Sequence, residues 1–475
     1  MVLATISDGI GRGVESISDT VSGLFFEPVI RLGVTGLSRA GKTVFITSLV
    51  SNLIERGRMP GLVAAREGRI TAAYLQPQPS DLLPRFEFER HLGALTARAP
   101  QWPEGTRHIS ELRLSLKVQP NGLLGSVQGP RTVHVDIVDY PGEWLLDLGL
   151  LEKSFAEWSQ QTLATIAGRE PEADFMALAN GTDAAQKLDE PVAQKLALTY
   201  TQHLAAARAA GFYNCTPGRF LLPGDLAGSP ALTFAPLRPV EQPPRKSLWR
   251  EMERRFEAYK AQVVKPFFRE HFARIDRQIV LVDVLGAIHK GPQAMADMQQ
   301  GMADILSAFK PGTNAFLSKI FLGRRVEKIL FAATKADHLH HTQHARLTAL
   351  IEALVKDARS RAQFSGADTK ALSIAALRAT TEETREHNGD TLECVRGTLL
   401  NSDGSRGKQA ALYPGNLPEE PSQFLAEMSE RKQTWLDAEY DVMNFAPAVL
   451  TLAANEGPPH IRLDQAAEFL IGDKL

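Results

Sequence analysis

Cysteine and long apolar runs are what this sequence lacks. Its 475 residues include two cysteines, Cys215 and Cys394, which lie far apart and show no metal-ligand spacing. This usage indicates a reducing compartment and excludes a disulfide framework. No stretch approaches the roughly 20 uninterrupted apolar residues of a membrane-spanning helix. The first residues also lack the basic start and apolar segment of a secretory signal. We therefore expect a cytoplasmic protein.

The sequence also has no large excess of basic over acidic residues or of acidic over basic ones. The chain has 53 Lys and Arg residues against 55 Asp and Glu residues, for a formal net charge of -2. The surface as a whole therefore gives no reason to expect nucleic-acid binding. Internal repeats and low-complexity segments are absent from the sequence as well. The length indicates more than one domain, or one domain with large insertions.

A phosphate-binding pattern, GxxxxGKT, occupies residues 36–43, between the apolar run Val29–Val34 and a helical pattern over Val44–Ile54. Glycines let the loop turn tightly, and the following helix presents its positive N-terminal end to an anion. Lys42 would reach the β and γ phosphates, and the Thr43 hydroxyl would bind Mg2+. The alternative is a Gly-containing turn before a helix. The candidate nucleotide-binding residues are Ser38, Arg39, Ala40, Gly41, Lys42, Thr43 and Val44, with Lys42 also catalytic.

The first 28 residues place apolar side chains three or four positions apart, which predicts an amphipathic helix. Such a face either packs on the following domain or binds a membrane surface or a partner. The polar face is not rich in Lys or Arg, which argues against the membrane interpretation.

A segment of residues 58–110 is broken by six prolines and precedes an alternating strand at Glu111–Val118. Small GTPases carry a Mg2+-sensing threonine just before such a strand, so Thr106 is the candidate metal ligand, and Thr71 is the alternative. Arg107 and Arg69 are candidates for a charge-neutralising arginine, with Arg107 the one we assign to catalysis together with Thr106. Ordinary surface roles stay open for all four.

A second alternating strand, Val133–Val138, ends in the DxxG pattern of GTPases. Asp139 is placed to hold Mg2+ through a water, and Gly142 to offer its backbone N–H to the γ phosphate. Glu143 occupies the position where many GTPases have a water-orienting glutamine, and we assign it to catalysis. Its charge would repel a polyphosphate, so we expect slow hydrolysis.

Residues 144–278 predict a large insertion. Residues 144–168 and 184–211 have helical patterns, 216–245 are rich in proline, and 247–277 indicate one long charged helix. We expect a helical subdomain that is hinged on the nucleotide-binding core.

The core resumes with the continuous apolar run 278–285, typical of a buried parallel strand, and a helix over 292–309. A strand at Lys328–Ala333 then leads into Thr334-Lys335-Ala336-Asp337, which fits the base-reading [NT]KxD motif. Asp337 can accept two hydrogen bonds from the N1 and N2 donors of guanine, and the Lys335 stem can lie over the base. His338 is the adjacent nucleotide-binding candidate.

Two further features follow the base motif. His338, His340, His341 and His344 crowd together, and metal binding by them stays open, although their spacing matches no standard zinc site. The strand 370–376 lies where GTPases bring a backbone N–H to the guanine O6. The nucleotide-binding candidates there are Ser373, Ala375 and Ala376.

The C-terminal part predicts a small β hairpin or meander over 390–418, with a turn at Asn401–Gly404, and helices at 421–440 and 463–471. The expected division of the chain is 1–28, 29–143, 144–278, 279–389, 390–420 and 421–475.

The segments GLSRAGKT, DIVDYPGEW, LVDVLGA, ATKADH and SIAALRAT, in this order, resemble the YcjX family of bacterial P-loop proteins, over about residues 5–475. The resemblance implies a stress-associated GTPase with a Ras-like core, and members are often encoded beside an inner-membrane partner. Thr334 departs from the asparagine of many GTPases, which leaves base specificity less determined than the phosphate site. The resemblance assigns nucleotide roles to Gly41, Lys42, Thr43, Asp139, Gly142, Lys335 and Asp337.

The sequence thus predicts an α/β, three-layer P-loop NTPase fold with a mostly parallel sheet, a large helical insertion and a small β-rich C-terminal addition. The expected ligands are GTP or GDP and Mg2+, and the expected activity is slow GTP hydrolysis by a conformational switch. One alternative is an ATPase of the same fold. Another is an adaptor without significant hydrolysis that docks a membrane-bound partner, at the periphery of the inner membrane.

Overall fold

The structure is a computed structural model that describes residues 27–36, 40–105, 108–120, 129–167, 169, 173–307, 326–364, 366–401, 403–429 and 444–475. The helix expected over residues 1–28 lies outside these ranges except for its last two positions. Among the described helices, none is both long enough and apolar enough to span a bilayer.

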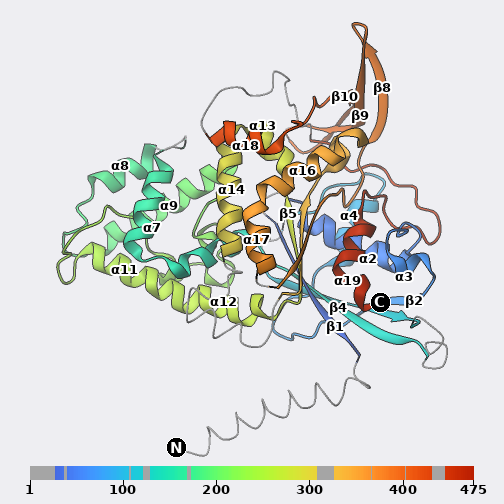
Figure 1. The fold of residues 1–475 in the computed structure, drawn as a ribbon. Coiled ribbons are helices and arrows are strands. Elements are labelled where there is room, and N and C mark those ends of the chain that lie inside the picture. The colour runs from blue at the N-terminus through green and yellow to red at the C-terminus, as the bar shows by residue number, and fades with distance from the viewer. Residues whose placement is uncertain are drawn as a thin grey trace, which may run out of the picture.

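A seven-stranded sheet forms the centre of the molecule (Figure 1). Strand β1 lies between β4 and β5 and is parallel to both, and β5, β6 and β7 continue the parallel part. Strands β2 and β3 are added antiparallel beyond β4. In spatial order the strands are β2 (Ile70–Gln76), β3 (Ser110–Val118), β4 (Arg131–Asp139), β1 (Val29–Gly36), β5 (Arg277–Val282), β6 (Lys328–Ala333) and β7 (Asp368–Ser373).

Helices cover both faces of this sheet, which confirms the expected three-layer α/β fold. Strand β5 shows why its sequence is continuously apolar. Ile279 and Leu281 belong to one core, while Val280 and Val282 belong to the other, so both faces of the strand are buried. The first face is covered by α2 (Lys42–Glu55) and α19 (Leu463–Ile471). The second is covered by α13 (Val284–Lys290), α14 (Pro292–Ser307), α16 (His344–Leu354) and α17 (Lys356–Phe364).

The structure corrects two expectations at the sheet. Strand β2 occupies part of the segment we interpreted as irregular, and its sequence ITAAYLQ gives little strand signal because it is an edge strand with only Ile70 buried. The strand expected over 278–285 ends at Val282. Asp283 ends it by accepting a hydrogen bond from the Gly286 N–H (2.9 Å), which caps α13.

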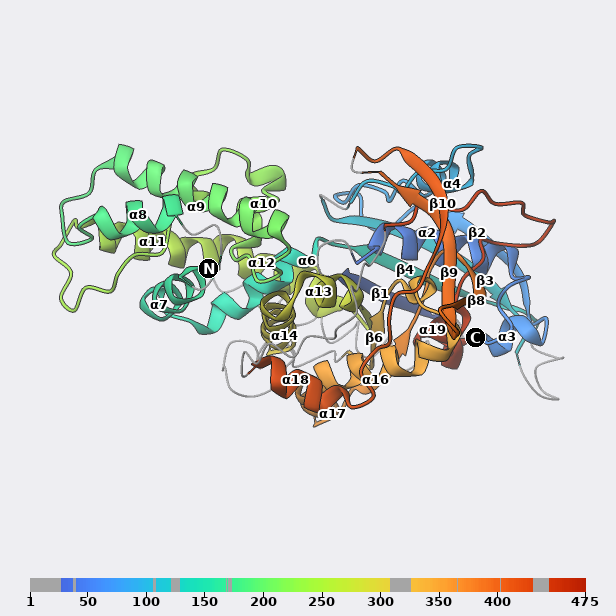
Figure 2. The ribbon, with the colours of Figure 1, turned by 90° about the horizontal axis from the view of Figure 1, so that it is seen from above.

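Helices dominate the residues that follow β4, and seen from above they form a lobe beside the sheet (Figure 2). They are α6 (Gly142–Leu146), η1 (Asp147–Glu152), α7 (Phe155–Ile166), α8 (Ala173–Gly181), α9 (Glu190–Ala210), α10 (Gly218–Leu221), η2 (Gly224–Leu226), η3 (Pro230–Leu232), α11 (Leu248–Tyr259), η4 (Lys260–Val264), α12 (Lys265–Glu270) and η5 (Phe272–Arg274).

The single long helix expected over 247–277 is wrong. It is interrupted by the π-helical turn η4, and its α-helical part ends at Glu270. Pro266 has no N–H to donate to the preceding turn, so the regular hydrogen-bond ladder cannot continue there. Within η4, Lys260 donates from Nζ to the Lys153 carbonyl (2.8 Å), which ties the altered turn to η1.

One apolar core joins this helical lobe to the second face of the sheet. Trp158, Tyr200 and Phe256 of the lobe belong to the same cluster of buried side chains as Val280 and Phe331 of the sheet. The lobe therefore shares its core with the sheet.

A second, three-stranded antiparallel sheet stands at one end of the molecule (Figure 1). Its strands are β8 (Thr381–His387), β9 (Asp390–Leu400) and β10 (Arg406–Leu412). The expected β addition is confirmed, but it begins at Thr381. Asn388 and Gly389, both with positive φ (53° and 91°), form the two-residue turn between β8 and β9, and this Asn-Gly pair is a hairpin signal that we had not used.

This small sheet is inserted between β7 and α19. Ala375 and Ile461 exchange backbone hydrogen bonds (3.1 and 2.8 Å), so the segment leaves and rejoins the main fold at one place. The described parts of the remaining helices are α3 (Val63–Arg66), α4 (Phe88–Thr96), α18 (Pro421–Ser429), η6 (Ala336–His338), η7 (His341–Gln343) and η8 (Gly472–Lys474).

Candidate functional site

The predicted motifs follow strands that end at one edge of the main sheet. The registers pair Val34 with Asp139, Gly36 with Leu281, and Val282 with Ala333, which in turn pairs with Ser373. Because all these strands are parallel, the loops after them leave from the same edge. This edge, at the carboxyl ends of parallel strands, is where α/β sheets bind ligands.

The described part of the P-loop comprises Gly36 and residues 40–43. Gly41 has φ +81°, and a Cβ built on it would meet no atom of the described residues within 4 Å. At Gly36 the same addition would lie 2.8 Å from the Leu281 carbonyl oxygen, so glycine is required there. Lys42 is buried and donates from Nζ to the Gly36 carbonyl (3.2 Å). The Lys42 side chain thus points back to the first residue of the motif.

Of the other P-loop candidates, Ala40 is buried in the core and Val44 is half-buried on the first turn of α2. Ser38 and Arg39 lie outside the described residues.

The candidate metal ligands are a hydroxyl and a carboxylate. Thr43 follows Lys42 on α2, and Asp139 is the last residue of β4 and is buried. Hard oxygen donors of this kind suit Mg2+, so the donor set fits the ion. Thr43 donates from Oγ1 to the Glu104 carbonyl (3.4 Å), which brings the segment before Thr106 to the P-loop.

The candidates for the Mg2+-sensing threonine and for the charge-neutralising arginine divide into two groups. Thr106 and Arg107 lie outside the described residues. Arg69 and Thr71 lie where β2 pairs with the end of β3, next to the start of β4, at the opposite edge of the sheet from Asp139. Neither of these two alternatives is at the P-loop edge.

The DxxG segment is tied to the helical lobe. Gly142 begins α6, and Glu143 beside it is 5% exposed. An Arg208 guanidinium nitrogen of α9 lies 2.9 Å from the Glu143 Oε1. A Cβ added to Gly218 would lie 2.2 Å from the Glu143 carbonyl oxygen, so α10 packs directly on this backbone. The Glu143 carboxylate therefore pairs with the lobe in this structure.

Two further contacts extend the connection. The Arg219 guanidinium lies 3.2 Å from the ring centre of Trp144, whose indole N–H donates to the Leu222 carbonyl (3.0 Å). Asp147 accepts hydrogen bonds from the Gly218 N–H (2.7 Å) and the Tyr259 hydroxyl (2.6 Å).

The base motif begins with an ion pair. Lys335, in the left-handed conformation (φ 60°), places Nζ 2.5 Å from the Asp283 Oδ2 at the end of β5. Burial raises the pKa of Asp283, but the Lys335 charge and its hydrogen bond outweigh burial, so the net pKa is lowered. Thr334 donates both its N–H (2.9 Å) and its hydroxyl (3.3 Å) to the Val282 carbonyl. The segment is thus held on β5.

Asp337 is 4% exposed, and its Oδ2 accepts a hydrogen bond from the Ala379 N–H (2.8 Å). Its backbone carbonyl accepts one from the Thr380 hydroxyl. His338 packs edge-on against Phe445, with ring centres 5.1 Å apart, and burial lowers its pKa. These contacts place the residues just before β8 against the base motif.

The candidates for contact with the guanine O6 lie at the end of β7. Ser373 is fully buried, and its hydroxyl donates to the His344 carbonyl (3.0 Å). The Ala375 N–H donates to Ile461, so in this conformation it is engaged by the protein. Ala376 is half-buried in the bend that follows. The nucleotide roles of these residues stay predictions.

Sequence reasoning missed several partners that the structure places at the site. Asp283 carried a usable signal, since it is a polar residue directly after a buried strand. Arg208 and Glu104 carried none, because both act on motif residues from distant parts of the chain.

Comparison with known proteins identifies the family. A family model described as "YcjX-like family, DUF463" matches residues 30–475. A protein named "Ras-like GTPase YcjX" from Escherichia coli (strain K12) is 38% identical over 461 residues, covering 94% of this chain and 96% of the relative. Another of the same name, from Shewanella oneidensis, is 36% identical over 475 residues and covers 94% of each chain. Together with the P-loop, DxxG and TKAD segments at one sheet edge, these matches confirm the resemblance seen in the motifs, and the chain belongs to the YcjX-like family.

Proposed function

We propose that the chain binds GTP and GDP, hydrolyses GTP slowly with Mg2+, and acts as a nucleotide-dependent conformational switch. The observation that carries this proposal is the convergence of the P-loop, DxxG and TKAD segments on one edge of the sheet. The name "Ras-like GTPase" of both relatives supports it. From the cysteine usage and the missing apolar runs we also propose a cytoplasmic location, and from the family resemblance a role in a stress response with a partner at the inner membrane.

The phosphate end of the site relies on Lys42, Thr43 and Asp139. Lys42 would leave the Gly36 carbonyl and pair with the phosphates, since an anion is a better partner for an ammonium group than a neutral carbonyl. Thr43 and Asp139 would hold Mg2+, which neutralises phosphate charge when bound. No atom of the described residues occupies the space beside Gly41, where the phosphates would meet the N-terminus of α2.

The base end relies on Asp337 and Lys335. The Ala379 N–H fixes the Asp337 carboxylate through one oxygen, which orients it without neutralising its charge. A carboxylate can accept from both the N1 and the N2 donors of guanine, whereas adenine offers no such pair. This is the basis for proposing GTP over ATP.

The switch relies on the connection between the DxxG segment and the lobe. Gly142 would contact the γ phosphate through its N–H, and its neighbour Glu143 is paired with Arg208 on α9. A shift of Gly142 on loss of the γ phosphate would therefore displace Glu143 relative to Arg208 and change the packing of α6 against α10. Slow hydrolysis follows as well, because a carboxylate held by Arg208 is a poor group to orient water beside a polyphosphate.

Calorimetry of GTP, GDP and ATP binding to the full chain with Mg2+ tests the ligand, and phosphate release in the same preparation tests the activity. We expect Lys42→Ala to weaken GTP binding by at least about 100-fold, because an unscreened charge-assisted contact to phosphate is lost. The exposed Lys408→Ala on β10 is the matched control. Equal GTP affinity in Lys42→Ala and Lys408→Ala would refute the phosphate site.

Asp337→Asn tests the base assignment. Asparagine still offers an oxygen to the Ala379 N–H, so the fold should be kept, while one guanine donor loses its acceptor. The ratio of GTP to ATP affinity should fall by about 10-fold or more, the cost of one mispaired polar contact. A wild-type preference for ATP, or a ratio that Asp337→Asn leaves unchanged, would show that Asp337 does not read guanine.

A further inference from the structure

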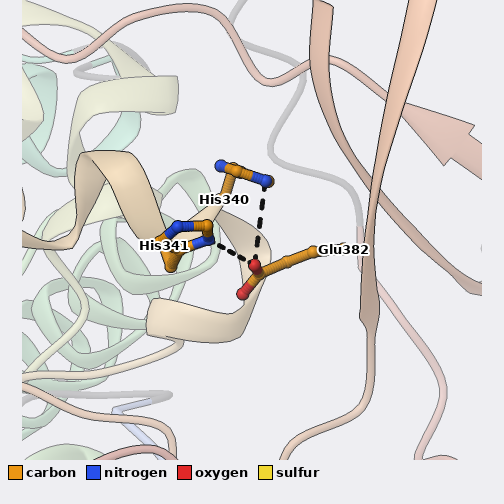
Figure 3. Close-up of side chains that lie close together, drawn as sticks. All are labelled: His340, His341 and Glu382. Atoms are coloured by element: carbon orange, nitrogen blue, oxygen red, sulfur yellow. Dashed lines mark hydrogen bonds and ion pairs between the residues drawn. The ribbon is translucent and has the colours of Figure 1, made fainter.

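Two of the clustered histidines meet a carboxylate from the small sheet. Figure 3 shows the side chains of His340, His341 and Glu382 close together. In the chain, His340 and His341 lie between η6 and α16, and Glu382 is on β8. The His341 Nδ1 is 2.6 Å from the Glu382 Oε2, and the His340 Nε2 is 3.7 Å from the same oxygen. One ligand atom from each of the three residues lies within 4.8 Å of the other two. The other two histidines are not part of this group, since His344 bonds the Ala336 carbonyl (2.8 Å) and His338 packs on Phe445.

The distances suit a metal ion between these atoms. Nitrogen and oxygen ligands at about 2.0–2.2 Å from a tetrahedral zinc ion lie roughly 3.4 Å from one another. The two observed separations, 2.6 and 3.7 Å, fall on either side of this value. The third separation, between the two imidazole nitrogens, is below 4.8 Å, so side-chain rotations could bring the three atoms to ligand spacing.

The surroundings orient the ligands in the way that metal sites require. His340 is 8% exposed, and its Nδ1 lies 3.0 Å from the Thr342 Oγ1 and 3.6 Å from the Glu393 Oε2. The Thr342 hydroxyl donates to Glu393. With its Nδ1 facing a hydroxyl and a carboxylate, His340 presents Nε2 to Glu382, which is the carboxylate–histidine–metal arrangement.

The carboxylate is oriented as well. Arg378 holds the other oxygen of Glu382, Oε1, at 3.2 Å, so Oε2 is the oxygen that faces the two imidazoles. Both sides of the cluster are thus set by neighbours that are not ligands themselves.

We propose that His340, His341 and Glu382 form a binding site for a divalent transition-metal ion of the zinc class. Two imidazoles and one carboxylate favour such an ion over Mg2+ or Ca2+, which prefer oxygen ligands. Three protein ligands leave a fourth position for water. Glu393 is not a ligand in this proposal; it orients the His340 imidazole through the Thr342 hydroxyl.

The proposed ion would join two parts of the chain beside the base motif. His340 and His341 follow Asp337 closely, and Glu382 follows Ala379 and Thr380, which donate hydrogen bonds to Asp337. A bound ion would therefore fasten β8 to the segment that carries Asp337. The site itself depends only on the cluster, so its test needs no nucleotide.

The experiment is a titration of the full, chelator-treated chain with Zn2+ by calorimetry, with the visible absorption of bound Co2+ as a second readout. We expect one site per chain, and a loss of at least about 100-fold in Zn2+ affinity in His340→Ala and in Glu382→Gln, since even outer partners of metal ligands are worth 10–100-fold. His341→Ala should weaken Zn2+ binding by a similar factor. Because the His341 side chain is exposed, its removal should leave the fold intact, so a loss of affinity would not come from misfolding. The matched control is His387→Ala, at an exposed histidine on β8, the strand that carries Glu382. This variant should bind Zn2+ as the wild type does.

Thermal unfolding gives an independent check. Saturating Zn2+ should raise the melting temperature of the wild type and of His387→Ala and leave that of His341→Ala unchanged, because an ion that binds the folded state stabilises it. Absence of a stoichiometric site, or equal Zn2+ affinity in His341→Ala and His387→Ala, would overturn the proposal and leave a hydrogen-bonded His–Glu cluster.

Discussion

Asp147 is a carboxylate buried between the DxxG segment and the helical lobe. It is 2% exposed and accepts hydrogen bonds from the Gly218 N–H and the Tyr259 hydroxyl. Burial raises its pKa to about 6, although these hydrogen bonds act in the opposite direction. We therefore expect the contacts of η1 with α10 and α11 to depend on pH.

The sign of this effect follows from the two pKa values. A carboxyl whose pKa is higher in the folded than in the unfolded state adds stability that is fully present below the unfolded pKa and is lost as pH rises through the folded pKa. For Asp147 the window runs from about pH 4 to about pH 6.

We predict that Asp147→Asn changes the pH profile of stability. The free energy of unfolding of the wild type, relative to the variant, should fall by about 3 kcal/mol between about pH 4 and pH 7, because the variant has no proton to lose. Urea unfolding across this range measures the difference. Asp225→Asn, at an exposed carboxylate that pairs with Arg219, is the control. A constant difference between wild type and Asp147→Asn across this range would contradict the raised pKa.

At the scale of elements, α6 and α9 are joined by the Glu143–Arg208 ion pair. Glu143 is buried, and the Arg208 side chain is one third exposed, so the pair is only partly screened by water. The proposed switch requires that a change at Gly142 reach α9 through this contact.

We predict that Arg208→Ala loosens this connection. The free energy of unfolding should fall by about 2 kcal/mol, the value of a charged hydrogen bond whose buried partner is left behind. Hydrogen exchange of α9 amides should then differ less between the GTP and GDP states than in the wild type.

Lys195→Ala, at an exposed cation on the same helix, should keep the wild-type exchange difference. If Arg208→Ala keeps it too, the nucleotide signal does not pass through this ion pair.

At the scale of the whole molecule, the shared core limits how the lobe can move. Trp158 and Phe256 of the lobe and Val280 and Phe331 of the sheet lie in one apolar cluster. A lobe that swung freely would expose part of this surface, at about 25 cal/mol per Å². We therefore infer small shifts of packed helices rather than a wide hinge motion.

We predict that the lobe and the sheet unfold together. GTP with Mg2+ at about 100 times its dissociation constant should stabilise the protein by roughly 3 kcal/mol, and the shift should appear equally in tryptophan fluorescence and in circular dichroism. Fluorescence reports on the lobe because Trp144, Trp158 and Trp249, three of the five tryptophans, are buried there. A fluorescence transition that nucleotide leaves in place, while the dichroism transition shifts, would contradict the shared core.

The predictable features of this protein are those encoded within a few neighbouring residues. Glycine spacing and an apolar run before it are local, so the P-loop, the strands β1, β4 and β6, and the motifs after them could be predicted. The family resemblance could be recognised for the same reason, because short local motifs carry it. The hairpin at Thr381–Leu400 was encoded locally too, in Asn388-Gly389.

The partners of the predicted residues became visible only in the folded chain. Lys335 pairs with Asp283, Asp337 bonds Ala379, and Glu143 pairs with Arg208. The same holds for the meeting of His340 and His341 with Glu382. The sequence was enough to choose the candidate site residues, because residue type and local backbone conformation depend on near neighbours. It could not determine which side chains meet, because that depends on how distant segments pack into one core.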